Sequence, residues 1–258
     1  MKRRTLVCAL PALAIGAAAR AAETAPAAAD ARRYVAISLI GDKYQVMGNR
    51  GQSETGSMLT LSRLAEVPMP GAPCDRAVLE TLVSAVPNAD PRASVSCLAA
   101  SAPAFFEDQD EWFDGKRLAL PAQLHKAVLR EQGESLLLVT KHRGRALVRG
   151  ASGRESMGGV SGRFEGLGFY RDGATAVVVV DEEGQAREHD NGFVAPFVYV
   201  KLSLVDIATF TVVRDKVIEH ATPLVISSPG KHQPLAQTLE SMLREDVEFA
   251  VQGVVRPA

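Results

Sequence analysis

Hydrophobic and polar residues alternate along Phe197–Glu219, and this alternation predicts the centre of the fold. In its first half one face carries apolar residues and the other carries Tyr199, Lys201 and Ser203; the apolar positions are Val198, Val200, Leu202 and Leu204. A polar break at Asp206–Thr209 precedes a second alternating run. A period of two is typical of a half-buried antiparallel hairpin. We therefore expect other strands to pair with this hairpin and helices to cover its apolar face.

The chain before the hairpin switches between strand and helix patterns. Strands are predicted at Tyr34–Ile40, Tyr44–Met47, Leu59–Val67, Ala93–Ala99 and Leu136–Val139, and helices at Asp75–Val86 and Pro121–Gly133. Gly41-Asp42 is a two-residue turn signal, which predicts that the first two strands form a hairpin. With a last amphipathic helix at Pro234–Val251, the order indicates an α/β to α+β fold. We expect a mixed sheet with a β-α-β-α-β start, an antiparallel meander and a C-terminal helix.

The N-terminus has the pattern of a bacterial export signal. In Met1–Ala21, three cations precede an apolar run too short to span a membrane, and small residues follow at a cleavage site. Arg3-Arg4 leaves both the general and the twin-arginine export route open. We expect a signal peptide at 1–21, a flexible linker at 22–32, and a single α/β domain at 33–255 with a glycine-rich insertion at 149–173. This predicts a periplasmic or secreted protein.

Charge excludes several classes of partner. The whole chain has 29 basic and 30 acidic residues, and loss of the signal peptide removes four of the cations and no acid. The mature chain is therefore acidic, with a net charge of about −5. An acidic chain without a basic stripe is a poor ligand for nucleic acid or anionic lipid. We expect no nucleic-acid partner and no membrane span after signal cleavage.

Export would leave two cysteines, Cys74 and Cys97. In an oxidising compartment such a pair usually bonds. A helix from Asp75 followed by a returning strand would bring the two together, so we expect a disulfide, with two free thiols as the alternative. Their spacing suggests neither a redox motif nor a zinc site.

The sequence contains no complete catalytic serine motif. Ser161 lacks the final glycine of a nucleophile elbow, and Ser228 and Lys231 are separated by Pro-Gly, which forbids a shared helical face. No cofactor, metal or catalytic residue is predicted. The candidate binding residues are Trp112, in an acidic loop, His142, at the end of a buried strand where α/β sites tend to lie, and Phe169 and Tyr170, in the glycine-rich segment.

Two runs carry a family resemblance. Leu136–Thr140 and the hairpin sequence from Val200-Lys201-Leu202 to Lys216 resemble periplasmic α/β domains of the curli-secretion-lipoprotein and TolB amino-terminal type. The run Glu165–Tyr170 is similar to uncharacterised secreted proteins of proteobacteria. The resemblance implies a non-enzymatic envelope protein that binds another protein or a wall component. The alternatives are a periplasmic hydrolase whose site forms only in three dimensions, and a small-ligand binder that uses the Trp112 loop.

Overall fold

The computed structural model describes residues 31–49, 61–146, 162–172, 176–180, 186–190, 193–222, 224–225 and 235–256. These residues belong to one compact unit. The predicted signal peptide at 1–21 and the linker as far as residue 30 lie outside the described residues, so their assignment stays a prediction.

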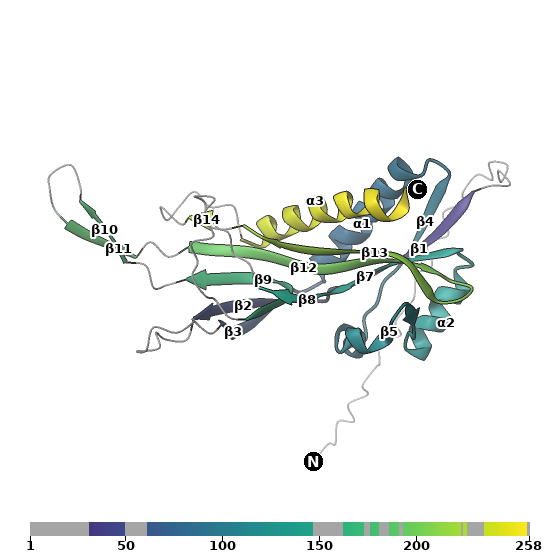
Figure 1. The fold of residues 1–258 in the computed structure, drawn as a ribbon, viewed down its shortest axis with the longest axis horizontal. Helices are drawn as coiled ribbons and strands as arrows, with labels where there is room; N and C mark the ends of the chain where they lie inside the picture. The colour runs from purple at the N-terminus through teal and green to yellow at the C-terminus, as the bar shows by residue number, and fades with distance from the viewer. Residues whose placement is uncertain are drawn as a thin grey trace, which may run out of the picture. The chain divides into compact units, whose positions relative to one another are not determined.

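Within the described residues, three helices, a large mixed sheet and a separate two-stranded sheet make up the fold (Figure 1). The helices are α1 (Pro73–Ala89), α2 (Ala122–Arg130) and α3 (Leu235–Val255), with two 3₁₀ turns, η1 (Pro103–Phe106) and η2 (Gln109–Trp112). The first strands are β1 (Arg32–Leu39), β2 (Lys43–Asn49), β3 (Leu61–Pro68), β4 (Ala93–Leu98), β5 (Phe113–Asp114), β6 (Arg117–Leu118), β7 (Ser135–Lys141) and β8 (Arg143–Arg145). The later ones are β9 (Arg163–Asp172), β10 (Ala176–Val180), β11 (Ala186–Asp190), β12 (Phe193–Asp206), β13 (Thr211–Ala221) and β14 (Leu224–Val225). The predicted fold class is confirmed.

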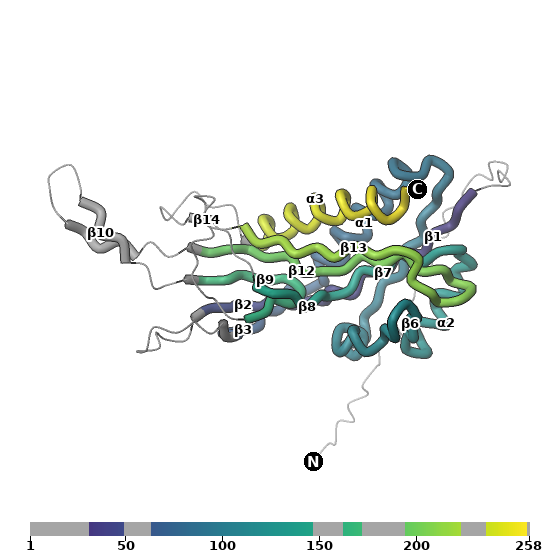
Figure 2. The backbone as a smooth tube through the Cα atoms, viewed as in Figure 1, coloured from purple at the N-terminus to yellow at the C-terminus, as the bar shows by residue number. Residues whose placement is uncertain are grey.

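Strand β12 organises the sheet. On one side it pairs with β13 along almost its whole length (Figure 2). On its other side the C-terminal half pairs with β7 and the N-terminal half with β9. The β12–β13 hairpin is the one predicted from the alternation, and its turn is closed by Asp206, whose carboxylate accepts hydrogen bonds from the backbone and hydroxyl of Thr209.

The alternation was interpreted as a half-buried strand, and in this respect the prediction was wrong. The even positions of β12 pack in the core beneath α1 and α3, as expected. Tyr199 and Ser203, on the expected polar face, are also buried. The second face is covered by α2 and the η turns at one end, and it carries an aromatic cluster at the other. Strand β12 therefore has neighbouring strands on both edges and packed side chains on both faces.

The predicted hairpin between the first two strands is also wrong. Strand β1 lies parallel to β4 and β7, whereas β2 pairs with β3 and β9. The carboxylate of Asp75, the first residue of a predicted helix, explains this. It accepts hydrogen bonds from the backbone nitrogens of Ile40 (2.9 Å) and Gly41 (3.0 Å) and from the hydroxyl of Ser38 (2.6 Å). Because these donors are engaged by α1, they are not free to form a two-residue hairpin turn.

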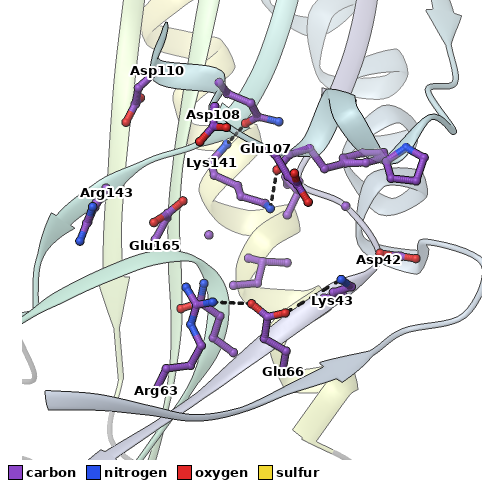
Figure 3. A pocket seen from close by; sticks show the side chains of 18 of the residues that line it. Asp42, Lys43, Arg63, Glu66, Glu107, Asp108, Asp110, Lys141, Arg143 and Glu165 are labelled. Carbon is purple, nitrogen blue, oxygen red and sulfur yellow. Dashed lines mark hydrogen bonds and ion pairs between the residues drawn. The ribbon is translucent and has the colours of Figure 1, made fainter.

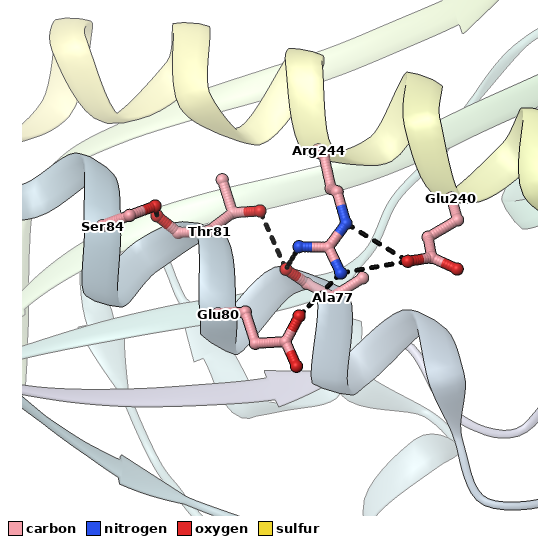
Figure 4. A network of polar contacts seen from close by, with 6 residues as sticks. All are labelled: Ala77, Glu80, Thr81, Ser84, Glu240 and Arg244. Atoms are coloured by element: carbon pink, nitrogen blue, oxygen red, sulfur yellow. Dashed lines mark hydrogen bonds and ion pairs between the residues drawn. The ribbon is translucent and has the colours of Figure 1, made fainter.

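A polar network joins α1 to α3 on the helix-covered face (Figure 4). Arg244 of α3 donates to Glu80 of α1 at 2.7 Å, to the Ala77 carbonyl at 3.3 Å, and to Glu240 on its own helix at 3.0 Å. The guanidinium thereby links the two helices at the rim of their apolar contact.

The disulfide predicted between Cys74 and Cys97 is absent from the structure, where both are free thiols. Cys74 is buried in the core and its thiol lies 3.8 Å from the sulfur of Met69. Cys97 is exposed on β4, whose described strand neighbour is β1 alone. Burial raises the pKa of the Cys74 thiol to about 12, which disfavours the reactive thiolate.

Candidate functional site

A cleft of about 670 Å³ lies where the parallel strands β1 and β7 end. Ile40 and Gly41, which follow β1, and Lys141, which ends β7, line it. In sheets of α/β proteins, ligands bind outside the carboxyl ends of the strands. The cleft therefore occupies the position that the fold favours for a binding site.

Five parts of the chain form the walls (Figure 3). The η1–η2 segment provides one wall, the β1–β2 connection and β3 a second, and the ends of β7–β8 and β9 the remainder. Charged side chains from these walls face the space; they are Asp42, Lys43, Arg63, Glu66, Glu107, Asp108, Asp110, Glu111, Lys141, Arg143 and Glu165. The cleft is thus polar and carries charges of both signs, with carboxylates in excess.

Gln109 fixes the η1–η2 wall to the sheet. Its side chain is buried and its amide donates to the carbonyls of Leu39 (2.7 Å) and Phe105 (2.8 Å). Its amide oxygen accepts a hydrogen bond from the backbone nitrogen of Lys141 at 2.9 Å. One side chain thereby joins the ends of β1 and β7 and the 3₁₀ turn. Because these groups are buried, losing the amide would leave several polar atoms without partners.

Lys141 projects from the end of β7 toward the cleft and donates to the Phe106 carbonyl at 2.8 Å (Figure 3). Gly166 makes room for its stem, since a Cβ at that position would lie 3.3 Å from the Lys141 Cγ, and its backbone has a positive φ of 67°. Burial lowers the pKa of Lys141, and nearby Glu165 partly offsets the shift. The ammonium is partly desolvated and, within the described residues, has no carboxylate within ion-pair distance.

Arg143 and Glu165 face the cleft from paired positions on β8 and β9. Across the cleft, Glu66 pairs with Arg63 and lies 3.9 Å from Lys43. The charges of Arg63 and Lys43 are therefore compensated by the protein, whereas Lys141 and Arg143 form no ion pair with an acidic side chain in the described part of the chain. These two cations are available to a ligand.

Asp75 lies directly behind the β1 wall. Burial raises its pKa to about 6, although hydrogen bonds from Ser38, Ile40 and Gly41 favour the ionised form and limit the rise. The carboxylate does not line the cleft. Its function is to hold the Ile40–Gly41 backbone, which does line the cleft, against the start of α1.

The predicted binding residues Trp112 and His142 lie near the cleft but do not line it. Trp112 is half-buried and packs on the core beneath α2. His142 points to the other face of the sheet, where its Nε2 lies 3.2 Å from Glu219 of β13. Its neighbours Lys141 and Arg143 do line the cleft. The end of β7 was therefore the right place to expect a site, but His142 was the wrong residue.

Phe169 and Tyr170 are in β9 and not in an insertion. Of the glycine-rich segment predicted at 149–173, residues 163–172 form this strand, and 149–161 with 173 lie outside the described residues. Phe169 is buried against Tyr44 and Tyr170 is buried beside Phe164. Buried rings cannot contact a partner directly, and their alternation across the strand explains why they enter two different cores.

Sequence reasoning missed Gln109, Lys141 and Arg143. For the two cations a signal existed, because Lys-His-Arg directly follows the buried strand β7. Nothing local in the sequence distinguishes Gln109 from its acidic neighbours. Within the described residues no group of three or more histidine, cysteine or acidic side chains is placed to hold a metal ion. In the same part of the chain, no helix is long and apolar enough to cross a membrane.

Comparisons with known proteins identify no family. No family model matches the chain, and no curated protein matches it. Among solved structures, a neuraminyllactose-binding hemagglutinin homolog from Helicobacter pylori has a TM-score of 0.38 at 9% identity, covering 87% of this chain and 85% of that one. Protein XCC0632 from Xanthomonas campestris has a TM-score of 0.35 at 10% identity, covering 87% and 81%. The PelC dodecamer from Paraburkholderia phytofirmans has a TM-score of 0.32 at 8% identity, covering 88% and 89%.

At TM-scores below 0.5 these likenesses carry no argument about function. None of the three is described as a curli-secretion or TolB protein. The resemblance to those families stays a prediction from the sequence.

A second polar constellation lies on the opposite face of the sheet from His142. The Nδ1 atom of His220 lies 2.9 Å from Asp246 of α3, and its Nε2 atom lies 2.8 Å from the hydroxyl of Thr222. A hydroxyl, an imidazole and a carboxylate in this order match the connectivity of a hydrolase triad. Thr222 is exposed, and none of the three lines either of the two described pockets.

Proposed function

We propose that this chain is a non-enzymatic cell-envelope protein that binds a charged, polar ligand in the cleft at the ends of β1 and β7. The observation that carries the proposal is the pair of uncompensated cations, Lys141 and Arg143, in a cleft whose other walls present carboxylates. The envelope location is supported by the signal-like N-terminus at 1–21.

The arrangement of charges indicates the class of ligand. Lys141 and Arg143 suit a carboxylate, because charge-assisted hydrogen bonds are the strong ones. Glu165, Asp108 and Asp110 suit an ammonium group. A ligand that carries both groups would satisfy both sets. Peptide and amino-sugar fragments of the bacterial cell wall have this chemistry, and the envelope would supply them.

The test is titration calorimetry with a panel of wall-derived peptides and amino-sugar fragments. Lys141→Met and Arg143→Met should each weaken binding by about tenfold or more, because each removes a charge-assisted hydrogen bond. Lys126→Met is the matched control: it removes an exposed cation on α2 that does not line the cleft, and it should bind as the parent does.

Two outcomes would contradict the proposal. Either no fragment of the panel binds, or binding survives in the Lys141→Met and Arg143→Met double variant. N-terminal sequencing of the protein from periplasmic and cytoplasmic fractions tests the location separately, and an intact residue 1–21 segment on the native protein would reject export.

The hydrolase alternative is favoured by one observation, the Asp246–His220–Thr222 constellation. It predicts turnover of small acyl esters that is abolished in both Thr222→Ala and His220→Gln. Because the hydroxyl is secondary, exposed and outside the cleft, we prefer the binding function. Ester hydrolysis that disappears in both variants while cleft variants remain active would reverse that preference.

A further inference from the structure

Strand β13 has one open edge. Its inner side pairs with β12 from Thr211 to Ala221. On its outer side, among the described residues, it pairs only with the two-residue strand β6, through Thr211 and Arg117. From Arg214 to Ala221 no described strand follows it. An open edge presents backbone donors and acceptors that can accept another strand.

Hydrogen-bond directions show which backbone groups point outward. The Tyr199 carbonyl accepts a hydrogen bond from the His142 nitrogen, so Tyr199 faces away from β13. Successive residues of a strand face opposite sides, so the backbone groups of Val200 face β13, and those of its register partner Ile218 face β12 in return. The donors and acceptors of Asp215, Val217 and Glu219 therefore point away from the sheet. The hydrogen bond from the Thr222 nitrogen to the Pro196 carbonyl agrees with this alternation.

Apolar surface accompanies the edge. Val217 is 40% exposed and Val213 54% exposed, and Phe249 on the adjacent helix α3 is 71% exposed. Lys216 lies over the Phe249 ring at 5.7 Å from its centroid. An added strand would thus gain side-chain contacts as well as backbone hydrogen bonds.

Charge on β13 is sorted by face. The acids Asp215 and Glu219 lie opposite Ser203 and Tyr199, on the face away from α3. The bases Arg214 and Lys216 lie opposite Leu204 and Leu202, on the helix-covered face. Arg214 donates to carbonyls at the end of α3, which leaves Lys216 as the exposed cation of the edge.

This sorting excludes a second copy as the favoured occupant. Directly opposite residues of neighbouring antiparallel strands share a face. If two copies of β13 paired about a two-fold axis through the sheet, acids would meet only residues of the acidic face, and bases only residues of the basic face. No register would then provide an opposite-charge pair, and registers centred on Asp215, Lys216 or Val217 would oppose like charges.

We propose that the outer edge of β13, from Arg214 to Ala221, accepts an extended segment of a partner protein in antiparallel orientation. The segment places basic side chains opposite Glu219 and Asp215, an apolar side chain opposite Val217, and an acidic side chain opposite Lys216. From its N-terminus to its C-terminus, the five central residues of the segment are basic, apolar, apolar, acidic and basic. This surface is separate from the cleft, and the proposal does not depend on the cleft ligand.

The test uses two capped, fluorescent peptides of identical composition and the full chain. The first contains Lys-Val-Val-Glu-Lys and the second contains Lys-Val-Val-Lys-Glu, each with flanking threonines. By fluorescence anisotropy the parent should prefer the first by about fivefold, because two cross-strand charge pairs change sign between the peptides. The variant Asp215→Lys with Lys216→Glu should prefer the second by a similar factor.

A proline variant tests the backbone contact. Val217→Pro removes an outward N–H, which an edge strand tolerates, and should abolish binding of both peptides. Val217→Thr keeps the N–H and should retain binding, while circular dichroism checks that each variant folds. Binding that survives in folded Val217→Pro, equal affinity for the two peptides, or no binding of either would overturn the proposal. So would a dimer of the parent in analytical ultracentrifugation that Val217→Pro dissociates.

Discussion

Arg244 and Lys141 are both partly exposed cations, but their surroundings differ. Arg244 spans two helices, and its donors are met by Glu80, Glu240 and the Ala77 carbonyl (Figure 4). Lys141 donates to one carbonyl, that of Phe106, and faces a cleft (Figure 3). The first charge is compensated within the protein, and the second is held in place without compensation. A compensated charge indicates a structural role, and a positioned but uncompensated one indicates a site for a ligand.

Asp75 is a buried side chain whose carboxylate accepts three hydrogen bonds within the protein, and its removal should have the largest effect on stability. Asp75→Ala leaves the Ser38 hydroxyl and the Ile40 and Gly41 backbone nitrogens without their acceptor. We expect a loss of about 3 kcal/mol in the free energy of unfolding, since each buried unsatisfied donor is costly. Urea denaturation measures it. A loss below about 1 kcal/mol would mean that water replaces the carboxylate, and that Asp75 does not fix the β1 end.

The sequence indicates Asp75 only as the first residue of a helix, and this shows what local patterns can and cannot predict. Periodicity correctly placed the β12–β13 hairpin, both early helices and α3, because burial of one face is written into residue spacing. The Gly41-Asp42 signal failed because a carboxylate far along the chain binds the Ile40 and Gly41 nitrogens. Such a contact has no local signature.

The cleft was predictable to a similar degree. A charged group after the buried strand β7 marked the right strand end, since strand ends are where α/β sites lie. Both faces of the sheet are covered, and only the tertiary structure determines which of Lys141, His142 and Arg143 faces the cleft. Gln109 acts through backbone atoms of Leu39 and Lys141, which belong to strands far from it in the sequence.

The pH dependence of stability tests the buried carboxyl group in a second way. Burial raises the folded-state pKa of Asp75 to about 6 from the ordinary value of 3.8. An acid with a raised pKa binds its proton more tightly in the folded state, so its contribution is most favourable below about pH 4 and is lost as pH rises through 6. Between pH 4 and pH 7.5 the stability of the parent should fall by about 2 kcal/mol relative to Asp75→Asn. Parallel urea titrations of the two proteins give this difference, and a gap independent of pH would contradict the raised pKa.

Arg244→Met should have a smaller effect. Its side chain is 37% exposed, so solvent screens the pairs with Glu80 and Glu240, and we expect a loss of about 1 kcal/mol. Arg76→Met is the control, because Arg76 is exposed on α1 and its side chain, among the described residues, donates only to the nearby Gly71 carbonyl. Thermal unfolding of both variants in low and high salt should show a salt-sensitive loss for Arg244→Met alone. Equal losses would place Arg244 with ordinary surface cations.

Lys141→Met should have the smallest effect on stability and the clearest effect on binding. The methionine keeps the apolar stem beside Gly166 and removes a desolvated charge that, among the described residues, donates only to the Phe106 carbonyl. Loss of that bond and relief of the desolvation penalty oppose each other, so we expect a change within about 0.5 kcal/mol. The same variant should lose the cleft ligand. If Lys141→Met instead destabilised the protein as much as Arg244→Met does and left ligand binding intact, Lys141 would belong with the compensated charges, and the distinction drawn between the two cations would fail.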